Sequence, residues 1–238
     1  LLQPSHIPYA GNKIAASAIA MDKKLTKDVL RQAGISVCDE LVVKHNQFLD
    51  NPEGATEEIV REIEFPVVVK PAKSGSSVGV TVAEDQSSLV RGLIEAFEHD
   101  TKVLIEPRLV GRELEIAVLE NLAGEPETSI AGEIVLGGGG IYDYNAKYLS
   151  DAATLEVPAD LSEAELNQMQ AIAAKAFTAL GCEGLARVDF FLTEQGWFLS
   201  EVNTMPGFTP ISMYPKLWKE SGVEYPELIA RLIELAIR

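Results

Sequence analysis

The chain has 238 residues, a formal net charge of −16 and a hydrophobic fraction of 47%. Nucleic-acid binding needs clustered lysine and arginine, so this acidic balance excludes a nucleic-acid surface. No apolar run approaches the roughly 20 residues of a membrane-spanning helix, which excludes a transmembrane segment and leaves an ordinary globular protein.

The first half of the chain mixes helices and strands without a regular order. Residues 13–33 predict one helix, with Asn12 as its cap, Asp22 as an optional second cap and Gly34 as its end. The other elements expected here are strands at residues 67–70, 78–82 and 103–106, and a helix that begins after the cap Asp85.

The second half begins with two expected strands and ends with a helix. Its predicted elements are strands at residues 113–119 and 130–136, an irregular segment at 137–151, a helix between the capping box Ser162/Glu165 and Gly181, a hairpin of residues 185–193 and 197–202, and a helix at 224–237. Because the elements do not follow a repeated βαβ order, we predict an α+β fold.

Two cysteines, Cys38 and Cys182, lie far apart and lack metal-binding spacing. We expect both to be buried, reduced thiols, and we therefore expect a cytoplasmic protein.

A loop of small residues at 72–77 joins the strands predicted at 67–70 and 78–82. It matches neither a P-loop nor a dinucleotide fingerprint, because no helix follows its glycines. One interpretation is a hairpin tip whose N–H groups and hydroxyls lie over phosphates, with the cation of Lys70 beside them. The other is a solvated turn with a lysine that reaches out to water.

The hairpin near the C-terminus carries acidic residues at alternate positions. If residues 194–196 form a three-residue loop, Thr193 pairs with Trp197 and Asp189 lies opposite Glu201. Two opposed carboxylates repel each other unless a cation lies between them. Oxygen ligands of this kind suit Mg²⁺, so the hairpin predicts a metal site, although a solvent-facing polar stripe is the alternative.

Taken together, these segments resemble the ATP-grasp superfamily and, within it, the D-alanine–D-alanine ligase family. The resemblance rests on residues 67–71 (VVVKP), 75–79 (GSSVG), 187–189 (RVD), 201–207 (EVNTMPG) and 142–151 (YDYNAKYLSD). It implies two α+β subdomains that enclose a nucleotide, and a reaction in which ATP joins two D-alanines for peptidoglycan precursor synthesis. Assembly as a homodimer stays open.

The resemblance implies a role for individual residues. Contacts with ATP are implied for Lys23, Lys70, Ser76, Ser77, Glu106, Leu109, Glu113, Lys147 and Phe191. A pair of Mg²⁺ ions, with Mn²⁺ as a substitute, is implied at Asp189, Glu201 and Asn203. Catalytic roles are implied for Arg187, Gly207, Ser76 and Tyr148, and second-substrate contacts for Ser212 and Met213.

Members of the family also have an N-terminal domain, whose glutamate orients the first D-alanine and has no counterpart in this sequence. We therefore expect residues 1–12 to be a remnant of that domain or a linker, residues 13–106 to be the central subdomain and residues 107–238 the C-terminal one. A chain of this kind is expected to bind Mg·ATP but to ligate weakly. Two alternatives stay open: another ATP-grasp carboxylate–amine or D-alanine–D-lactate ligase, and a non-catalytic ATP-binding module.

Overall fold

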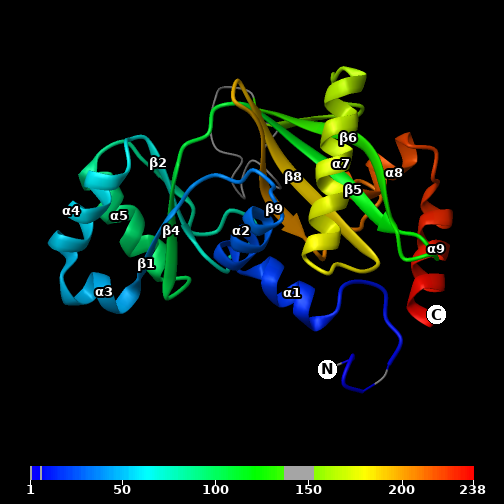
Figure 1. Cartoon of the computed structure of the whole chain (residues 1–238), viewed down its shortest axis with the longest axis horizontal. Coiled ribbons are helices and arrows are strands. Elements are labelled where there is room, and N and C mark those ends of the chain that lie inside the picture. The colour runs from blue at the N-terminus through cyan, green and yellow to red at the C-terminus, as the bar shows by residue number, and fades with distance from the viewer. Residues whose placement is uncertain (1, 6, 137–152) are drawn as a thin grey trace.

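The computed structural model describes residues 2–5, 7–136 and 153–238. Two antiparallel sheets lie next to each other, and helices cover the outer face of each (Figure 1). This arrangement confirms the predicted α+β class. Within the described residues, no helix is both long and apolar enough to cross a membrane.

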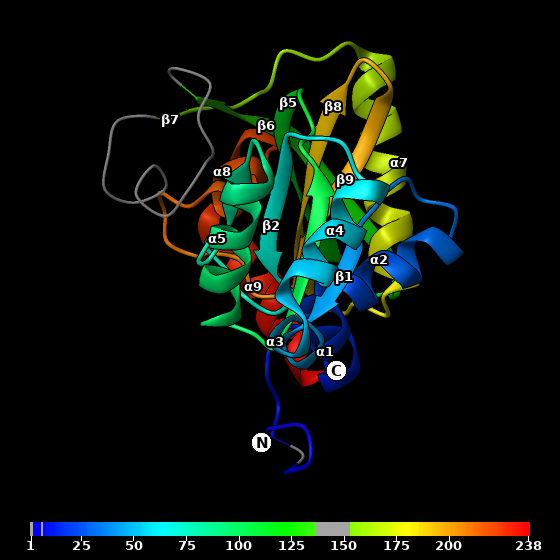
Figure 2. The same cartoon turned by 90° about the vertical axis from the view of Figure 1, so that its left-hand side faces the viewer.

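The smaller sheet has four strands in the order β1-β4-β2-β3. Its strands are β1 (Leu41–Lys44), β2 (Val67–Pro71), β3 (Thr81–Ala83) and β4 (Lys102–Pro107), and its helices are α3 (His45–Asp50), α4 (Pro52–Glu62) and α5 (Gln86–Phe97). These helices cover one face, which is turned to the viewer in Figure 2. Val67, Val69 and Ile105 point into the core beneath them, so the alternate residues Val68, Lys70 and Glu106 point out of the other face.

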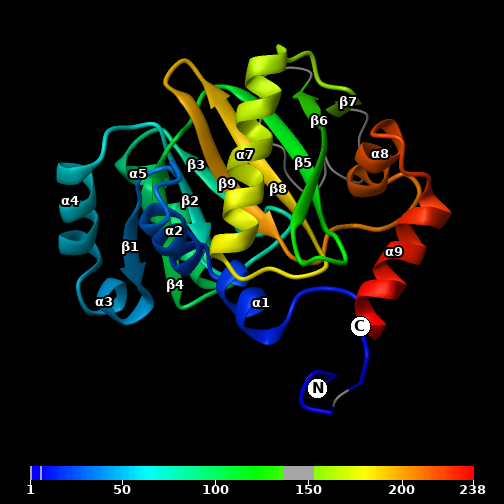
Figure 3. The ribbon, with the colours of Figure 1, turned by 45° about the vertical axis from the view of Figure 1, so that its right-hand side comes forward.

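The larger sheet has five strands in the order β7-β6-β5-β8-β9. Its strands are β5 (Arg112–Glu120), β6 (Pro126–Leu136), β7 (Ala153–Glu156), β8 (Leu185–Thr193) and β9 (Gly196–Asn203). Helix α7 (Glu163–Ala179) lies along one face, as Figure 3 shows, and shares a hydrophobic core with that face. Its capping box between Ser162 and Glu165 is present, as the sequence predicts.

One part of the other face of the larger sheet packs against helices, and the rest faces the smaller sheet. Ala117 and Leu119 of β5 pack under α8 (Met213–Glu220) and α9 (Tyr225–Ile237). Glu113 and Glu115 follow the same alternation on the same strand and are left facing the smaller sheet. One strand therefore supplies both a core and two carboxylates for a site.

The helix expected at residues 13–33 is two helices, α1 (Ile14–Met21) and α2 (Lys23–Gln32). Asp22 separates them: its backbone is extended, with φ −93° and ψ 104°, and its carboxylate accepts hydrogen bonds from the N–H groups of Lys24 and Leu25. An aspartate cap and a pair with Lys102, 2.5 Å away, together favour a new helix start over a continuous helix. Asn12 does not cap α1; its amide donates to the carbonyls of Leu185 and Thr204 instead.

Most other predicted elements are confirmed, but two strands differ in extent. Strand β6 begins at Pro126 and not at residue 130. The second strand of the glycine-loop hairpin is β3 at Thr81–Ala83, shorter than the predicted 78–82, because residues 75–80 form turns. The short elements β1, α3, α4, β7 and α8 were not predicted. The chain passes from one sheet to the other between Pro107 and Arg112, while α1 and α2 pack against the larger sheet. The predicted subdomain boundaries stay a proposal.

Candidate functional site

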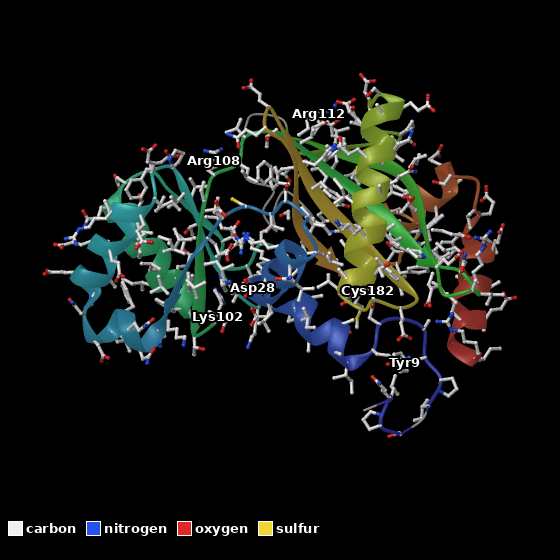
Figure 4. All side chains as sticks on the ribbon, viewed as in Figure 1. Tyr9, Asp28, Lys102, Arg108, Arg112 and Cys182 are labelled. Carbon is white, nitrogen blue, oxygen red and sulfur yellow. The ribbon has the colours of Figure 1, made fainter. Side chains whose placement is uncertain are left out.

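A cavity of about 490 Å³ lies between the facing sides of the two sheets. Strands β2, β3 and β4 form one wall, and β5, β6, β8 and β9 form the other. The segment between β4 and β5 joins the walls, and Figure 4 marks Arg108 and Arg112 near its two ends. Since ligand sites are concave and commonly lie between structural units, this cavity is the candidate functional site.

Ten residues predicted to contact a nucleotide or a metal line this cavity: Lys23, Lys70, Ser76, Ser77, Glu106, Leu109, Glu113, Asp189, Phe191 and Glu201. The cavity lining does not include five other predicted site residues: Arg187, Asn203, Gly207, Ser212 and Met213. Lys147 and Tyr148 lie outside the described residues.

Three lysines give the cavity a cationic wall. Lys70 ends 2.7 Å from one carboxylate oxygen of Glu106, and Lys27 ends 2.6 Å from the other. Burial would raise the pKa of Glu106, but the two ammonium groups hold that pKa below its ordinary value. The Lys23 ammonium donates to the carbonyl of Ser74 in the glycine loop, and burial lowers its pKa against the opposing effect of Glu201.

The glycine loop holds two serines in an uncommon backbone conformation. Ser76 and Ser77 have φ values of 52° and 58°, in the left-handed region that non-glycine residues rarely adopt. Gly79 follows at φ +71°, where a Cβ would lie 2.5 Å from the ring of His99. Strained serines that line a cavity are found mainly at ligand sites, which favours the phosphate-covering interpretation of this loop over a solvated turn.

The acidic hairpin has the predicted register at the end away from its turn, where Asp189 and Glu201 lie. Asp189 pairs with Glu201, and Arg187 pairs with Asn203. The predicted turn is wrong, however, because Thr193 pairs with Gly196 and not with Trp197. A two-residue turn replaces the three-residue loop, and a bulge at Ser200 restores the register on the far side.

Three carboxylates stand in a row across three neighbouring strands. Glu115 of β5 pairs with Asp189 of β8, which pairs in turn with Glu201 of β9. Arg187 holds two of them: its Nε and Nη2 each donate to Asp189 at 2.7 Å, and its Nε lies 3.2 Å from Glu115. Burial would lower the pKa of Arg187, but the carboxylates of Asp189 and Glu115 raise it. Arg187 therefore stays a permanent cation behind the acidic wall.

The donors present fit Mg²⁺ only in part. No group of three or more His, Cys, Asp or Glu side chains among the described residues is arranged to hold a metal ion. The oxygen of Asn203 accepts a hydrogen bond from the N–H of Met205 at 3.0 Å. Two opposed carboxylates still suit Mg²⁺, which commonly takes one or two carboxylates and completes its octahedron with waters and substrate phosphates. The donor set thus fits a cation that arrives with a phosphate ligand.

The residues predicted for the second substrate lie near the start of α8. The Ser212 hydroxyl accepts from the N–H of Thr209 at 3.1 Å, and a Cβ on Gly207 would approach the same hydroxyl to 3.1 Å. Met213 is buried in the core beneath α8, where its sulfur lies against Gly132. The side chain of Met213 therefore packs in the core, while substrate contacts at these positions stay a prediction.

Both cysteines are buried thiols, as the sequence predicts. Burial raises the pKa of Cys38 to about 11 and that of Cys182 to about 12. Because the thiolate is the reactive form, we expect both to react with Ellman's reagent at pH 8 on the order of 100-fold more slowly in the folded chain than in urea. Stopped-flow absorbance measures the two rates; equal rates would contradict the burial of these thiols.

Lys27 and Glu115 are among the charged residues of the cavity that were not predicted. Both carried a usable signal: Lys27 follows Lys23 by four residues on one helix, so they share a face. Glu115 follows Glu113 by two residues on one strand, which also gives a shared face.

Comparison with known proteins identifies a family. A family model described as "D-ala D-ala ligase C-terminus" matches residues 29–234. The chain is 46% identical to the D-alanine–D-alanine ligase of Acetivibrio thermocellus over 100% of this chain and 63% of the relative. It is likewise 46% identical to that of Geobacillus kaustophilus, over 100% of this chain and 64% of the relative. The chain thus spans less than two thirds of the length of these relatives.

Two solved structures are also similar. The D-alanine–D-alanine ligase of Coxiella burnetii has a TM-score of 0.85 and 39% identity, over 99% of this chain and 62% of that one. The D-Ala:D-Ser ligase VanG of Enterococcus faecalis has a TM-score of 0.87 and 34% identity, over 98% of this chain and 66% of that one.

Proposed function

The chain belongs to the D-alanine–D-alanine ligase family, and on this premise we propose that its cavity binds Mg·ATP for the joining of two D-alanines. The observation that carries the proposal is the opposite charge of the two walls. Lys23, Lys27 and Lys70 gather on one side, and Asp189 and Glu201 face them from the other. A polyphosphate with a divalent cation matches both walls, because lysines attract phosphate and carboxylates attract the cation.

The chain's own residues would position the nucleotide. Lys23 and Lys70 would meet the phosphates, while the N–H groups and hydroxyls of the Ser76–Ser77 turn would lie over them. The adenine would lie against Leu109 and Phe191, and Glu113 would accept from the ribose hydroxyls. Lys147, outside the described residues, keeps its proposed contact with the γ-phosphate.

In the proposed reaction, the carboxylate of one D-alanine attacks the γ-phosphorus and forms an acyl phosphate as ADP leaves. The amine of a second D-alanine then attacks the acyl carbon, phosphate leaves, and the amine loses a proton. Mg²⁺, when bound at Asp189, Glu201 and Asn203, would neutralise phosphate charge in the first step.

Arg187 and the Gly207 N–H would stabilise the oxyanion of the second step. Arg187 does not line the cavity, so this role requires its guanidinium to turn from the acidic row toward the substrate. Ser212 and Met213 would lie near the second D-alanine, and Tyr148 with Ser76 would order the surrounding segment. These assignments stay proposals, as do a cytoplasmic location and a homodimer.

The test is direct binding of ATP followed by phosphate release. Calorimetry should detect ATP binding that strengthens with Mg²⁺, and coupled phosphate release should require D-alanine. Adding D-serine, D-lactate or L-alanine beside D-alanine identifies the second substrate, a choice that matters because a similar structure is a D-Ala:D-Ser ligase. Absence of ATP binding would refute the proposal. Weak phosphate release that requires D-alanine fits the expected weak ligation. ATP binding with no such release, even after the N-terminal domain of the family is added, would favour a non-catalytic module.

A further inference from the structure

Lys27 is a buried cation next to Lys70, the lysine proposed to contact phosphate. It lies on a helix and not on any of the strands that form the cavity walls. It lies on α2 with only 3% of its side chain exposed. Its ammonium is 2.6 Å from Glu106 and donates to the carbonyl of Cys38 at 2.8 Å. Burying an ammonium is costly unless it is paired, so this arrangement calls for a reason.

The carboxylate of Glu106 is divided between two ammonium groups, one on each oxygen. With Lys27 and Lys70 both protonated, this triad carries one net positive charge. The next carboxylate, Glu40, lies 3.5 Å from Lys27 but is itself held by Arg31, whose Nη1 donates to it at 2.9 Å. Without Lys27, Glu106 and Lys70 would form a neutral pair, and Lys70 would attract an anion less strongly.

We propose that Lys27 is a positioning residue that pairs with one carboxylate oxygen of Glu106. The positive charge of Lys70 is then not fully neutralised by Glu106 and remains available to nucleotide phosphates. This inference rests on the proposed function, because it requires a nucleotide in the cavity. Lys27 acts through Glu106 and Lys70, and the proposal requires no contact between Lys27 and the nucleotide. It explains why a second lysine is buried beside Lys70 and Glu106.

The chain should tolerate the loss of Lys27. In a Lys27→Met variant the carbonyl of Cys38 keeps Arg31, whose Nη2 donates to it at 3.0 Å. Glu106 keeps Lys70, and Glu40 keeps Arg31. Methionine is close to lysine in length and removes the charge alone, so each partner retains another.

The experiment compares ADP with adenosine, which differ by the charged diphosphate. Calorimetry in saturating Mg²⁺ gives both dissociation constants for the wild-type chain, Lys27→Met, Glu106→Gln and the double variant. The ratio of the adenosine constant to the ADP constant isolates the phosphate contribution. We expect this ratio to fall roughly tenfold in Lys27→Met, to rise in Glu106→Gln, and to return toward the wild-type value in the double variant, which again has one net charge.

The matched control is Lys24→Met on the same helix. Lys24 pairs with Asp28 and with Glu40 at 3.4 Å, but not with Glu106, and it does not line the cavity, so its loss should leave the ratio unchanged. A ratio that is unaltered in Lys27→Met overturns the inference. A double variant that stays as low as Lys27→Met overturns it as well, since Lys27 would then contact phosphate directly. If the wild-type chain binds neither ADP nor adenosine, the proposed function itself is refuted. That result is distinct from the two outcomes that overturn only the role of Lys27.

Discussion

Replacing Arg187 with methionine is expected to lower the free energy of unfolding by about 3–5 kcal/mol at neutral pH. Arg187 is 15% exposed and holds Asp189 through two hydrogen bonds of 2.7 Å, with Glu115 close to its Nε. Its loss removes the cation that binds both oxygens of Asp189 and lies beside Glu115. For a chain of this size the melting temperature should fall by about 6–20 °C, which differential scanning calorimetry measures.

The matched control for Arg187→Met is Arg112→Met. The Nε and Nη2 of Arg112 likewise donate to the carboxylate of Glu133, but the side chain of Arg112 is 37% exposed. Exposed pairs contribute about 0–1 kcal/mol, so Arg112→Met should have a small effect. Similar losses of stability for the two variants would mean that Arg187 does not balance a buried acidic row.

The hairpin shows how far the sequence alone could lead. Alternation along residues 185–193 and 197–202 places Asp189 opposite Glu201, and the structure has that pair. The pair was predicted through a three-residue loop, but a two-residue turn and a bulge at Ser200 shift the strands by compensating amounts. Bulges leave no regular sequence signal, so the correct register here did not come from a correct turn.

The meeting of the two sheets could not be predicted from local patterns. Lys70 and Glu106 are adjacent across β2 and β4, and Lys27 reaches them from a helix that packs on the other sheet. Helical periodicity marks the face that carries Lys23 and Lys27, but it does not say what that face meets. The break at Asp22 had a local signal, its preference for a cap, and the pair with Lys102 that reinforces it is a tertiary contact.

The acidic row also bears on how a cation would be held. Asp189 accepts hydrogen bonds from Arg187 on both of its oxygens, and Asn203 accepts one from a backbone N–H, so two of the three predicted ligands already have a partner. A cation competes with these partners, and two carboxylates alone compensate poorly for the water it must lose. Phosphate oxygens would supply the remaining ligands, which predicts that metal and nucleotide bind together.

Asp189→Asn and Glu201→Gln are accordingly expected to remove most of the effect of Mg²⁺ on ATP affinity. In the wild-type chain the ATP dissociation constant should fall when Mg²⁺ is added. Because each variant keeps its shape and loses one charge, the ratio of the constants without and with Mg²⁺ should decrease by about tenfold or more. Calorimetry with ATP in EDTA and in Mg²⁺ gives both constants.

Glu133→Gln is the control for these two variants, because Glu133 of β6 also lines the cavity but is bound to Arg112 of β5. If general negative charge in the cavity sets the response to Mg²⁺, Glu133→Gln will reduce the ratio as much as the other two. If the cation is held by phosphates alone, neither Asp189→Asn nor Glu201→Gln will change it. A loss confined to Asp189→Asn and Glu201→Gln would mean that the cation lies between these two carboxylates, which face each other across β8 and β9 and would otherwise repel.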